Sequence, residues 1–257
     1  MTLEKEGSSN KIYLPDFSMS NANDELYFNA MNEYFSRSIG TTIEKLRNFP
    51  KYVPRSALST FLFKSELFQK ILHVNGSIVE CGVFLGGGLM TWAQLSAIYE
   101  PVNFTRTIIG FDTFSGFPII NEKDNTAYAK KGGVCADSYS DIIECIKLYD
   151  INRHINHISK IQLVKGDAIK TIPEYLKDNP HLVVSMLYLD FNLYEPTKIA
   201  LDTLIPRMPK GAMIVFDDLN LKMWQGATTS VCDSIGIHNL RIQRSHISPR
   251  ISYAIIE

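Results

Sequence analysis

Unbroken apolar runs that end on acidic residues are the most regular feature of this chain. Residues 183–190 read Val-Val-Ser-Met-Leu-Tyr-Leu-Asp, and residues 212–218 read Ala-Met-Ile-Val-Phe-Asp-Asp. Runs of this length without polar alternation are typical of strands buried on both faces of a parallel sheet. Similar runs at 77–83, 107–112 and 161–165 predict further strands of the same kind.

Segments with helical periodicity separate these strands. Pro196 can occupy the first turn of a helix whose apolar stripe ends before Pro206, and helices are also predicted near 89–99, 138–148 and 169–177. Two β-rich runs at 240–245 and 251–256 flank a Ser-Pro turn and predict a hairpin. We therefore expect an α/β fold with a doubly wound, mostly parallel seven-stranded sheet and an antiparallel C-terminal hairpin.

The N-terminal part has a different character. Helical periodicity runs from about residue 23 to 70, and Pro50 and Pro54 divide it. We expect residues 1–74 to form a helical extension or cap and residues 75–257 to form the α/β domain. Helices in this position can cap an active site or form a subunit interface, and the sequence alone does not choose between these roles.

Composition and charge exclude several classes of protein. The chain has 257 residues, 45% hydrophobic and 21% charged, with a formal net charge of −1. No basic run indicates a nucleic-acid or membrane partner, and no apolar run approaches the ~20 residues of a membrane span. The first residues lack the apolar core of a secretory signal, and the four cysteines lack metal-ligand spacing. A reduced, cytoplasmic protein is expected.

Acidic residues at strand ends are the first candidates for chemistry. Parallel strands would bring Asp190, Asp217 and Asp218 to one edge of the sheet, where open α/β sheets bind their ligands. Carboxylates are ligands for hard divalent cations, although strand-end acids also commonly cap helices. Glu80 lies inside an apolar run, and a buried unpaired carboxylate is costly. Either a ligand or a structural hydrogen bond could satisfy it.

A glycine-rich turn follows Glu80. Residues 80–87 read E-x-G-x-x-x-G-G, which differs from the dinucleotide fingerprint G-x-G-x-x-G. Glycines let the backbone approach a ligand at the start of a helix. Asp112 ends the next strand, where an acid can hold ribose hydroxyls. Trp224, after the aspartate pair, could line an acceptor pocket or simply pack.

Together these motifs resemble the class I S-adenosylmethionine-dependent methyltransferases. The similarity is greatest to the metal-dependent macrocin/mycinamicin O-methyltransferases, which act on deoxysugars. It rests on residues 78–87, 110–118, 166–167, 188–197 and 216–218. The resemblance implies a Rossmann-like fold, S-adenosylmethionine (SAM) and Mg²⁺ as cofactors, and a role in natural-product or surface-glycan biosynthesis. It also implies a small-molecule sugar acceptor, such as a TDP-sugar, and a homo-oligomer.

The resemblance further implies roles for single residues. Glu80 and the turn that contains Gly82, Val83, Gly86 and Gly87 would hold the methionine end of SAM. Asp112 would accept hydrogen bonds from the ribose, with Ser115 nearby, and Asp167 would reach the adenine. Asp190, Asp217 and Asp218 would hold Mg²⁺, which in relatives also binds two neighbouring sugar hydroxyls.

One position departs from the family pattern. The residue two places after the first metal-binding aspartate is usually a second aspartate, the proposed general base, and here it is Asn192. A neutral amide cannot take a proton near pH 7. The acceptor could lose its proton to water or to another group, or the protein could be a weakened or non-catalytic SAM-binding relative. An engineered substitution at this position would also explain it.

An NAD(P)-dependent oxidoreductase on the same sheet is the alternative from another class. The sequence disfavours it because G-x-G-x-x-G is absent. In addition, Asp112 lies about 30 residues beyond the glycine turn, and the fingerprint usually places its acid ~20 residues on.

Overall fold

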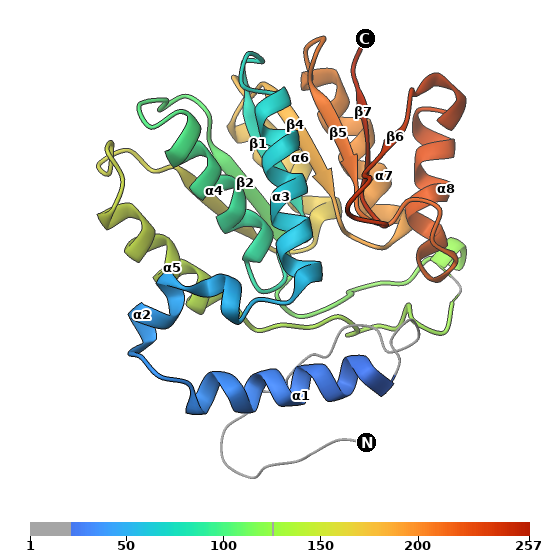
Figure 1. The fold of residues 1–257 in the computed structure, drawn as a ribbon. Coiled ribbons are helices and arrows are strands. Elements are labelled where there is room, and N and C mark those ends of the chain that lie inside the picture. Colours follow the sequence, from blue (N-terminus) through green and yellow to red (C-terminus); the bar gives the residue numbers. More distant parts are fainter. Residues whose placement is uncertain (1–21, 125) are drawn as a thin grey trace. The chain divides into compact units, whose positions relative to one another are not determined.

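The computed structural model describes residues 22–124 and 126–257. Within these residues a seven-stranded sheet has the order β3-β2-β1-β4-β5-β7-β6 (Figure 1). The strands are β1 (Ser77–Cys81), β2 (Ile108–Asp112), β3 (Ile161–Lys165), β4 (Val184–Leu189), β5 (Met213–Phe216), β6 (Gln243–Arg244) and β7 (Ser252–Ile255). The first five are parallel, and β7 runs antiparallel to both β5 and β6. The predicted fold class is confirmed.

The chain separates into two compact units, Met1–Arg55 and Ser56–Glu257. The described part of the first contains α1 (Ala22–Arg37), α2 (Thr42–Arg47) and a 3₁₀ turn at Phe49–Lys51. A capping box starts α2, because Thr41 and Glu44 satisfy each other's backbone N–H groups. The expected boundary between a helical extension or cap (residues 1–74) and the α/β domain (residues 75–257) stays a prediction. No helix among the described residues is long and apolar enough to cross a membrane.

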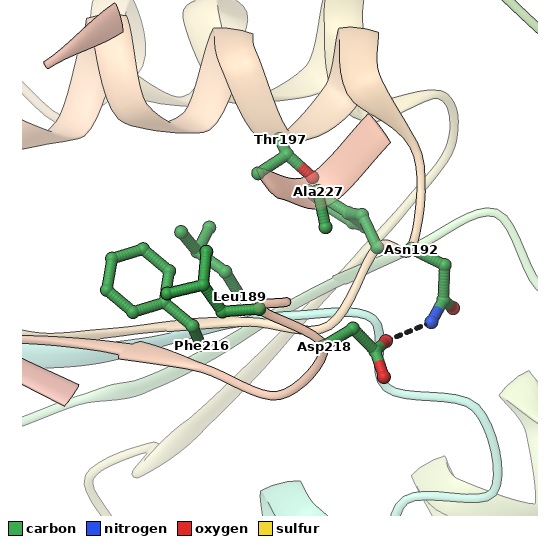
Figure 2. A pocket seen from close by; sticks show the side chains of 8 residues that line it. Leu189, Asn192, Thr197, Phe216, Asp218 and Ala227 are labelled. Atoms are coloured by element: carbon green, nitrogen blue, oxygen red, sulfur yellow. Dashed lines mark hydrogen bonds between the residues drawn. The ribbon is translucent and has the colours of Figure 1, made fainter. Parts of the chain in front are cut away.

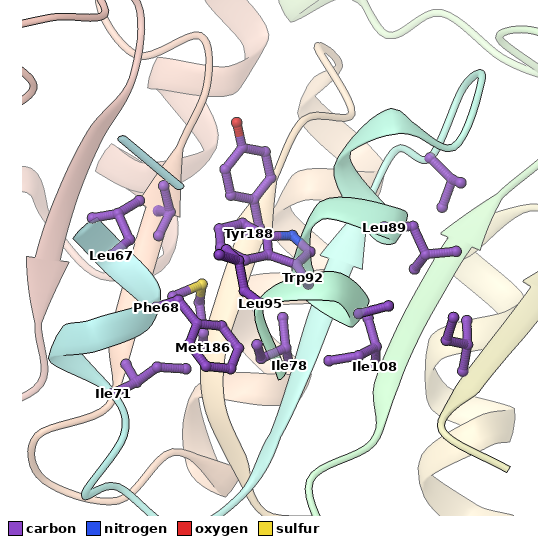
Figure 3. Close-up of a cluster of buried hydrophobic side chains, with 14 of the residues drawn as sticks. Leu67, Phe68, Ile71, Ile78, Leu89, Trp92, Leu95, Ile108, Met186 and Tyr188 are labelled. Atoms are coloured by element: carbon purple, nitrogen blue, oxygen red, sulfur yellow. The ribbon is translucent and has the colours of Figure 1, made fainter. Parts of the chain in front are cut away.

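Helices cover both faces of the sheet. On one face lie α3 (Arg55–Lys70), α4 (Gly87–Tyr99) and α5 (Tyr139–Ile151), and on the other lie α6 (Ala168–Asp178), α7 (Tyr194–Leu204) and α8 (Gln225–Ser234). Successive strand residues point to opposite faces, so Ile78 packs in the first layer (Figure 3) and Val79 in the second. This double burial explains the unbroken apolar runs.

Element boundaries differ from the predictions at a few places. The helix after the glycine turn begins at Gly87, two residues early, because Gly86 adopts a left-handed φ of 84° as its cap. The predicted strand 240–245 shrinks to the two residues of β6, which pair only with Ser252 and Tyr253 of β7. The four cysteines are free.

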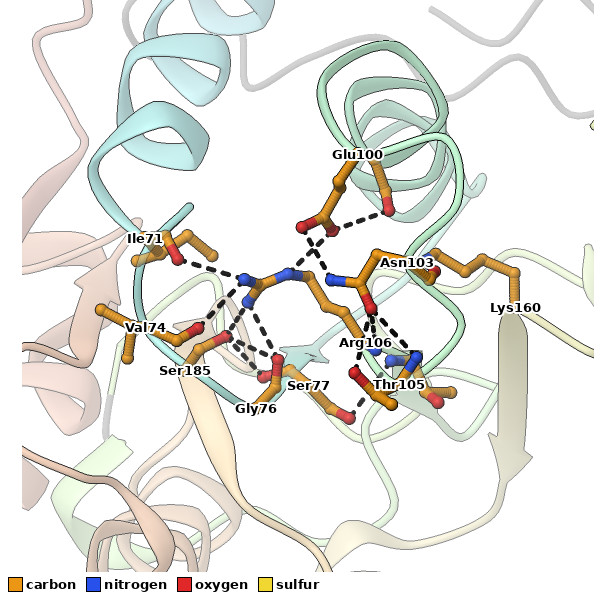
Figure 4. A network of polar contacts seen from close by, with 12 residues as sticks. Ile71, Val74, Gly76, Ser77, Glu100, Asn103, Thr105, Arg106, Lys160 and Ser185 are labelled. Carbon is orange, nitrogen blue, oxygen red and sulfur yellow. Dashed lines mark hydrogen bonds and ion pairs between the residues drawn. The ribbon is translucent and has the colours of Figure 1, made fainter. Parts of the chain in front are cut away.

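Buried Arg106 joins the amino-terminal ends of the strands (Figure 4). Its guanidinium donates to the carbonyls of Ile71, Val74 and Gly76 at 2.9–3.1 Å. Its Nε lies 2.8 Å from a carboxylate oxygen of Glu100, an ion pair outside hydrogen-bond geometry. The hydrogen bonds of the other two guanidinium nitrogens and the opposite charge of Glu100 offset the cost of burying this cation. This network fixes the end of the sheet opposite to the strand ends that the sequence marks as functional.

Candidate active site

The carboxyl ends of β1, β4 and β5 lie side by side. Cys81 is level with Leu189, and Leu189 is level with Phe216, so the next residues, Gly82, Asp190 and Asp217, start the loops at one edge. Gly82 has a φ of 94°, and a Cβ there would collide with the backbone of Asp190. Only glycine allows this approach. The strand-end acids therefore lie at one edge of the sheet, as predicted.

Three carboxylates form a cluster at this edge. Asp190, Asp217 and Asp218 each offer an oxygen, and these oxygens lie within 4.8 Å of one another. Burial, and then repulsion from its two neighbours, raises the pKa of Asp190 well above its usual range. Burial and Asp217 raise the pKa of Asp218 to about 7. A cluster under such repulsion favours a bound cation, and an all-carboxylate donor set suits Mg²⁺.

The chain itself engages every carboxylate oxygen of Asp217 and Asp218. The Tyr188 hydroxyl donates to Asp217 Oδ1 at 2.6 Å. The Arg250 guanidinium donates to Asp217 Oδ2 at 2.5 Å and to Asp218 Oδ1 at 2.9 Å. The Asn192 amide donates to Asp218 Oδ2 (Figure 2). Both acids are therefore held in fixed orientations.

Asn192 lies directly against this cluster. It adopts a left-handed φ of 62°, a conformation that Asn tolerates better than most residues. With Asp218 it lines a small pocket among Leu189, Phe191, Thr197, Phe216, Leu219 and Ala227 (Figure 2). Asn192 stands at the sequence position where the resemblance implies a base, and its amide here donates to a carboxylate.

Asp112 braces the glycine turn. Its Oδ2 accepts hydrogen bonds from the backbone N–H groups of Val83 and Phe84, at 2.8 and 2.9 Å, and its Oδ1 accepts from Phe114 at 2.7 Å. A carboxylate has about four acceptor positions, so these bonds leave one for a ligand hydroxyl. Asp112 thus has a structural role besides its predicted one.

Glu80 is buried beneath the start of α4. Its Oε1 lies 3.3 Å from the Lys64 ammonium of α3, while its Oε2 has no hydrogen-bond partner among the described residues. Burial raises the pKa of Glu80 despite the neighbouring ammonium. A Cβ on Gly88 would collide with both side chains, so this glycine lets the helix backbone come close to the pair. The free oxygen suits a ligand ammonium group, because it is an acceptor that the protein leaves unsatisfied.

The remaining predicted residues lie on neighbouring loops. Asp167 follows β3 and caps α6 by accepting from Ile169 N at 3.1 Å. Ser115 is exposed after β2. Trp224 packs edge-on against Phe117, with ring centroids 5.9 Å apart, so its packing role is observed. Whether Ser115, Asp167 and Trp224 bind a ligand stays a prediction.

Sequence reasoning missed Lys64, Tyr188 and Arg250 as members of the site. In the sequence, Lys64 stands out only as a charged residue within the apolar stripe of a helix, which does not show what it contacts. Its ammonium lies 4.2 Å from the Tyr188 ring centroid, and the ring sits beside Trp92 with its hydroxyl directed away from the apolar cluster (Figure 3). Arg250 has no local signal. It depends on the β5–β7 register, in which Phe216 pairs with Ser252; continuing this register sets Asp218 opposite Arg250.

Comparisons with known proteins point to O-methyltransferases. The sequence profile of a family described as Macrocin-O-methyltransferase (TylF) matches residues 66–243. A demethyldecarbamoylnovobiocin O-methyltransferase of Streptomyces niveus is 23% identical over 205 residues, which cover 74% of this chain and 72% of that protein.

Two solved structures of CalS11 resemble the whole chain. One, described as a calicheamicin methyltransferase, has a TM-score of 0.89 at 28% identity and covers 98% of both chains. The other, an apo form described as a TDP-rhamnose 3'-O-methyltransferase of calicheamicin biosynthesis, has a TM-score of 0.80 at 27% identity. It covers 96% of this chain and 99% of that one.

Proposed function

The chain belongs to the macrocin O-methyltransferase family, and from this premise we propose that it methylates a hydroxyl of a deoxysugar, using SAM and Mg²⁺. That it is an O-methyltransferase follows from the family and its relatives. The observation that supports the finer proposal is the cluster of Asp190, Asp217 and Asp218 beside the glycine turn. The sugar acceptor is proposed because the similar proteins are described as acting on such compounds.

The residues around the glycine turn fit SAM. Glu80 Oε2 would accept from the ammonium of the methionine part, and Lys64 balances the charge of the carboxylate. The open acceptor position of Asp112 would take a ribose hydroxyl, as the second strand of such folds commonly does. SAM supplies the methyl group on its sulfonium sulfur.

The acidic cluster fits a divalent ion. A sugar hydroxyl is a poor nucleophile at neutral pH, and Mg²⁺ supplies positive charge that favours its deprotonated form. Asp190, Asp217 and Asp218 would hold the ion, and Tyr188 orients Asp217 through its hydrogen bond. Holding the hydroxyl in line with the methyl group can lower the barrier by a further ~7–11 kcal/mol in well-oriented cases.

A transfer assay with labelled SAM tests the proposal. The acceptors are a panel of TDP-deoxysugars and deoxysugar glycosides, assayed with Mg²⁺ and with chelator. We expect label in at least one acceptor, loss of transfer in chelator and recovery on adding Mg²⁺. Full transfer in chelator would show that the reaction does not need a metal ion. Tight SAM binding without transfer to any acceptor would favour a non-catalytic relative, the alternative that Asn192 raises.

The formation of a homo-oligomer, which the family resemblance implies, stays a prediction.

Two adjacent glycines give a matched test of the cofactor site. A Cβ on Gly88 would collide with Glu80 and Lys64, whereas a Cβ on Gly87 meets nothing within 4 Å. We expect Gly88→Ala to displace the buried pair, to lower the melting temperature and to weaken binding of S-adenosylhomocysteine about tenfold or more, because a buried ion pair is disturbed. Gly87→Ala should melt like the parent. Equal melting and equal binding for Gly88→Ala and the parent would argue against a ligand role for Glu80.

A further inference from the structure

Arg250 occupies the place of a cation among the metal-binding candidates. One nitrogen of its guanidinium bridges Asp217 Oδ2 and Asp218 Oδ1, the two oxygens of this pair that Tyr188 and Asn192 leave free. Among the described residues, no hydrogen bond reaches the carboxylate of Asp190. The cluster thus holds a positively charged group that the chain itself provides.

The guanidinium and a divalent ion compete for the same oxygens. Mg²⁺ requires direct oxygen contacts at about 2.0–2.1 Å in near-octahedral geometry, and Arg does not lose its charge in proteins. Two cations on the same pair of carboxylates would repel each other strongly. We propose that Arg250 is the resident counter-ion of the metal-free cluster, and that a divalent ion binds by displacing it. This inference rests on the metal site of the proposed function.

The position of Arg250 allows this exchange. Its side chain is 51% exposed, whereas those of Asp217 and Asp218 are 12% and 1% exposed. Arg250 lies in the turn before β7, and Ser245 Oγ secures that turn by accepting from Ile247 N and Ser248 N. The guanidinium can therefore rotate into solvent while the backbone of the hairpin and the buried acids stay in place.

Such a counter-ion sets the affinity of the site for metal. When a binding-competent state is only partly populated, the apparent affinity falls by that fraction, so a bridge formed about nine-tenths of the time weakens metal binding about tenfold. In return, the bridge neutralises repulsion in the metal-free protein. Removing it should therefore tighten metal binding and destabilise only the metal-free state.

Calorimetric titration with Mn²⁺, in the absence of SAM and acceptor, tests this inference. The variants are Arg250→Gln, which removes the charge, Arg250→Lys, which keeps it but loses the planar fork, and Arg244→Gln. Arg244 is an exposed arginine of β6 and provides the same change of net charge on the same hairpin. We expect about tenfold tighter binding for Arg250→Gln, an intermediate value for Arg250→Lys and the parental value for Arg244→Gln.

Melting temperatures with chelator and with Mn²⁺ complete the test. Arg250→Gln should melt lower than the parent in chelator, and Mn²⁺ should remove most of that difference, which also shows that the variant is folded. Equal or weaker Mn²⁺ binding by Arg250→Gln, with the parent still binding, would overturn the inference and leave the proposed function intact. Absence of Mn²⁺ binding in the parent would overturn both.

Discussion

Asp190→Asn should abolish metal-dependent methyl transfer, with a loss on the order of 10³-fold in kcat/KM, because a metal ion supplies several kcal/mol of charge stabilisation. Asp190 is the most informative of the three acids, since no hydrogen bond among the described residues depends on its carboxylate. The Asn side chain keeps the size and removes the charge. The measurement is steady-state kinetics at saturating SAM across a Mg²⁺ titration. Asp202→Asn, on the exposed side of α7, is the control and should behave like the parent.

The same substitution should increase stability when metal is absent. Burial and its acidic neighbours raise the pKa of Asp190, so the charged form is disfavoured in the folded state. A carboxyl whose folded pKa exceeds its unfolded value of about 3.9 destabilises the protein at high pH, and the penalty disappears as pH falls below both values.

In chelator, Asp190→Asn should therefore melt above the parent at about pH 8, and the gap should narrow toward about pH 5 as the parental cluster takes up protons. Lower activity together with higher metal-free stability is characteristic of a functional site. A variant that keeps its activity, or that melts below the parent in chelator, would mean that Asp190 is structural.

Asn192→Asp should raise kcat in the presence of Mg²⁺ by on the order of 10²-fold or more, because a positioned general base contributes about 10²–10⁴-fold. The Asn192 amide lies within hydrogen-bond reach of Asp218, at the edge of the cluster. Asp also tolerates the left-handed conformation of this position, so the backbone does not oppose the substitution. The measurement is single-turnover methyl transfer with the best acceptor from the panel.

Asn192→Ala separates the effect of losing the amide from the effect of adding a base at this position. It removes the amide and its bond to Asp218 without adding a base, so it should not exceed the parental rate. In chelator, Asn192→Asp should melt below the parent, because a fourth carboxylate joins three others. If Asn192→Asp is no faster than the parent, the acceptor proton leaves by another route and the family pattern does not apply here.

The sequence predicted the sheet and the meeting of its strand-end acids for one physical reason. Strands buried on both faces read as unbroken apolar runs, and parallel strands all end at the same edge. Val184–Leu189 and Met213–Phe216 are such runs, so the positions of Asp190, Asp217 and Asp218 followed from topology. No knowledge of side-chain packing was needed.

The partners of these acids could not be predicted in the same way. Lys64 meets Glu80 because α3 packs on the first face of the sheet, and Arg250 meets Asp218 because of the β5–β7 register. Both depend on how distant elements align, and a register shift of one residue would turn Arg250 away. Likewise, the sequence marked Asp112 as a ligand candidate but did not reveal that it holds the N–H groups of Val83 and Phe84.

Calorimetric titration with S-adenosylhomocysteine, with and without Mg²⁺, is the most direct test of cofactor binding, because it does not depend on knowing the acceptor. We expect micromolar binding with one site per chain, and weaker binding by Glu80→Gln, since Glu80 Oε2 has no hydrogen-bond partner among the described residues and would accept from the ligand ammonium. No binding to the parent protein under either condition would contradict the cofactor roles of Glu80 and Asp112, and the methyl transfer proposed from them.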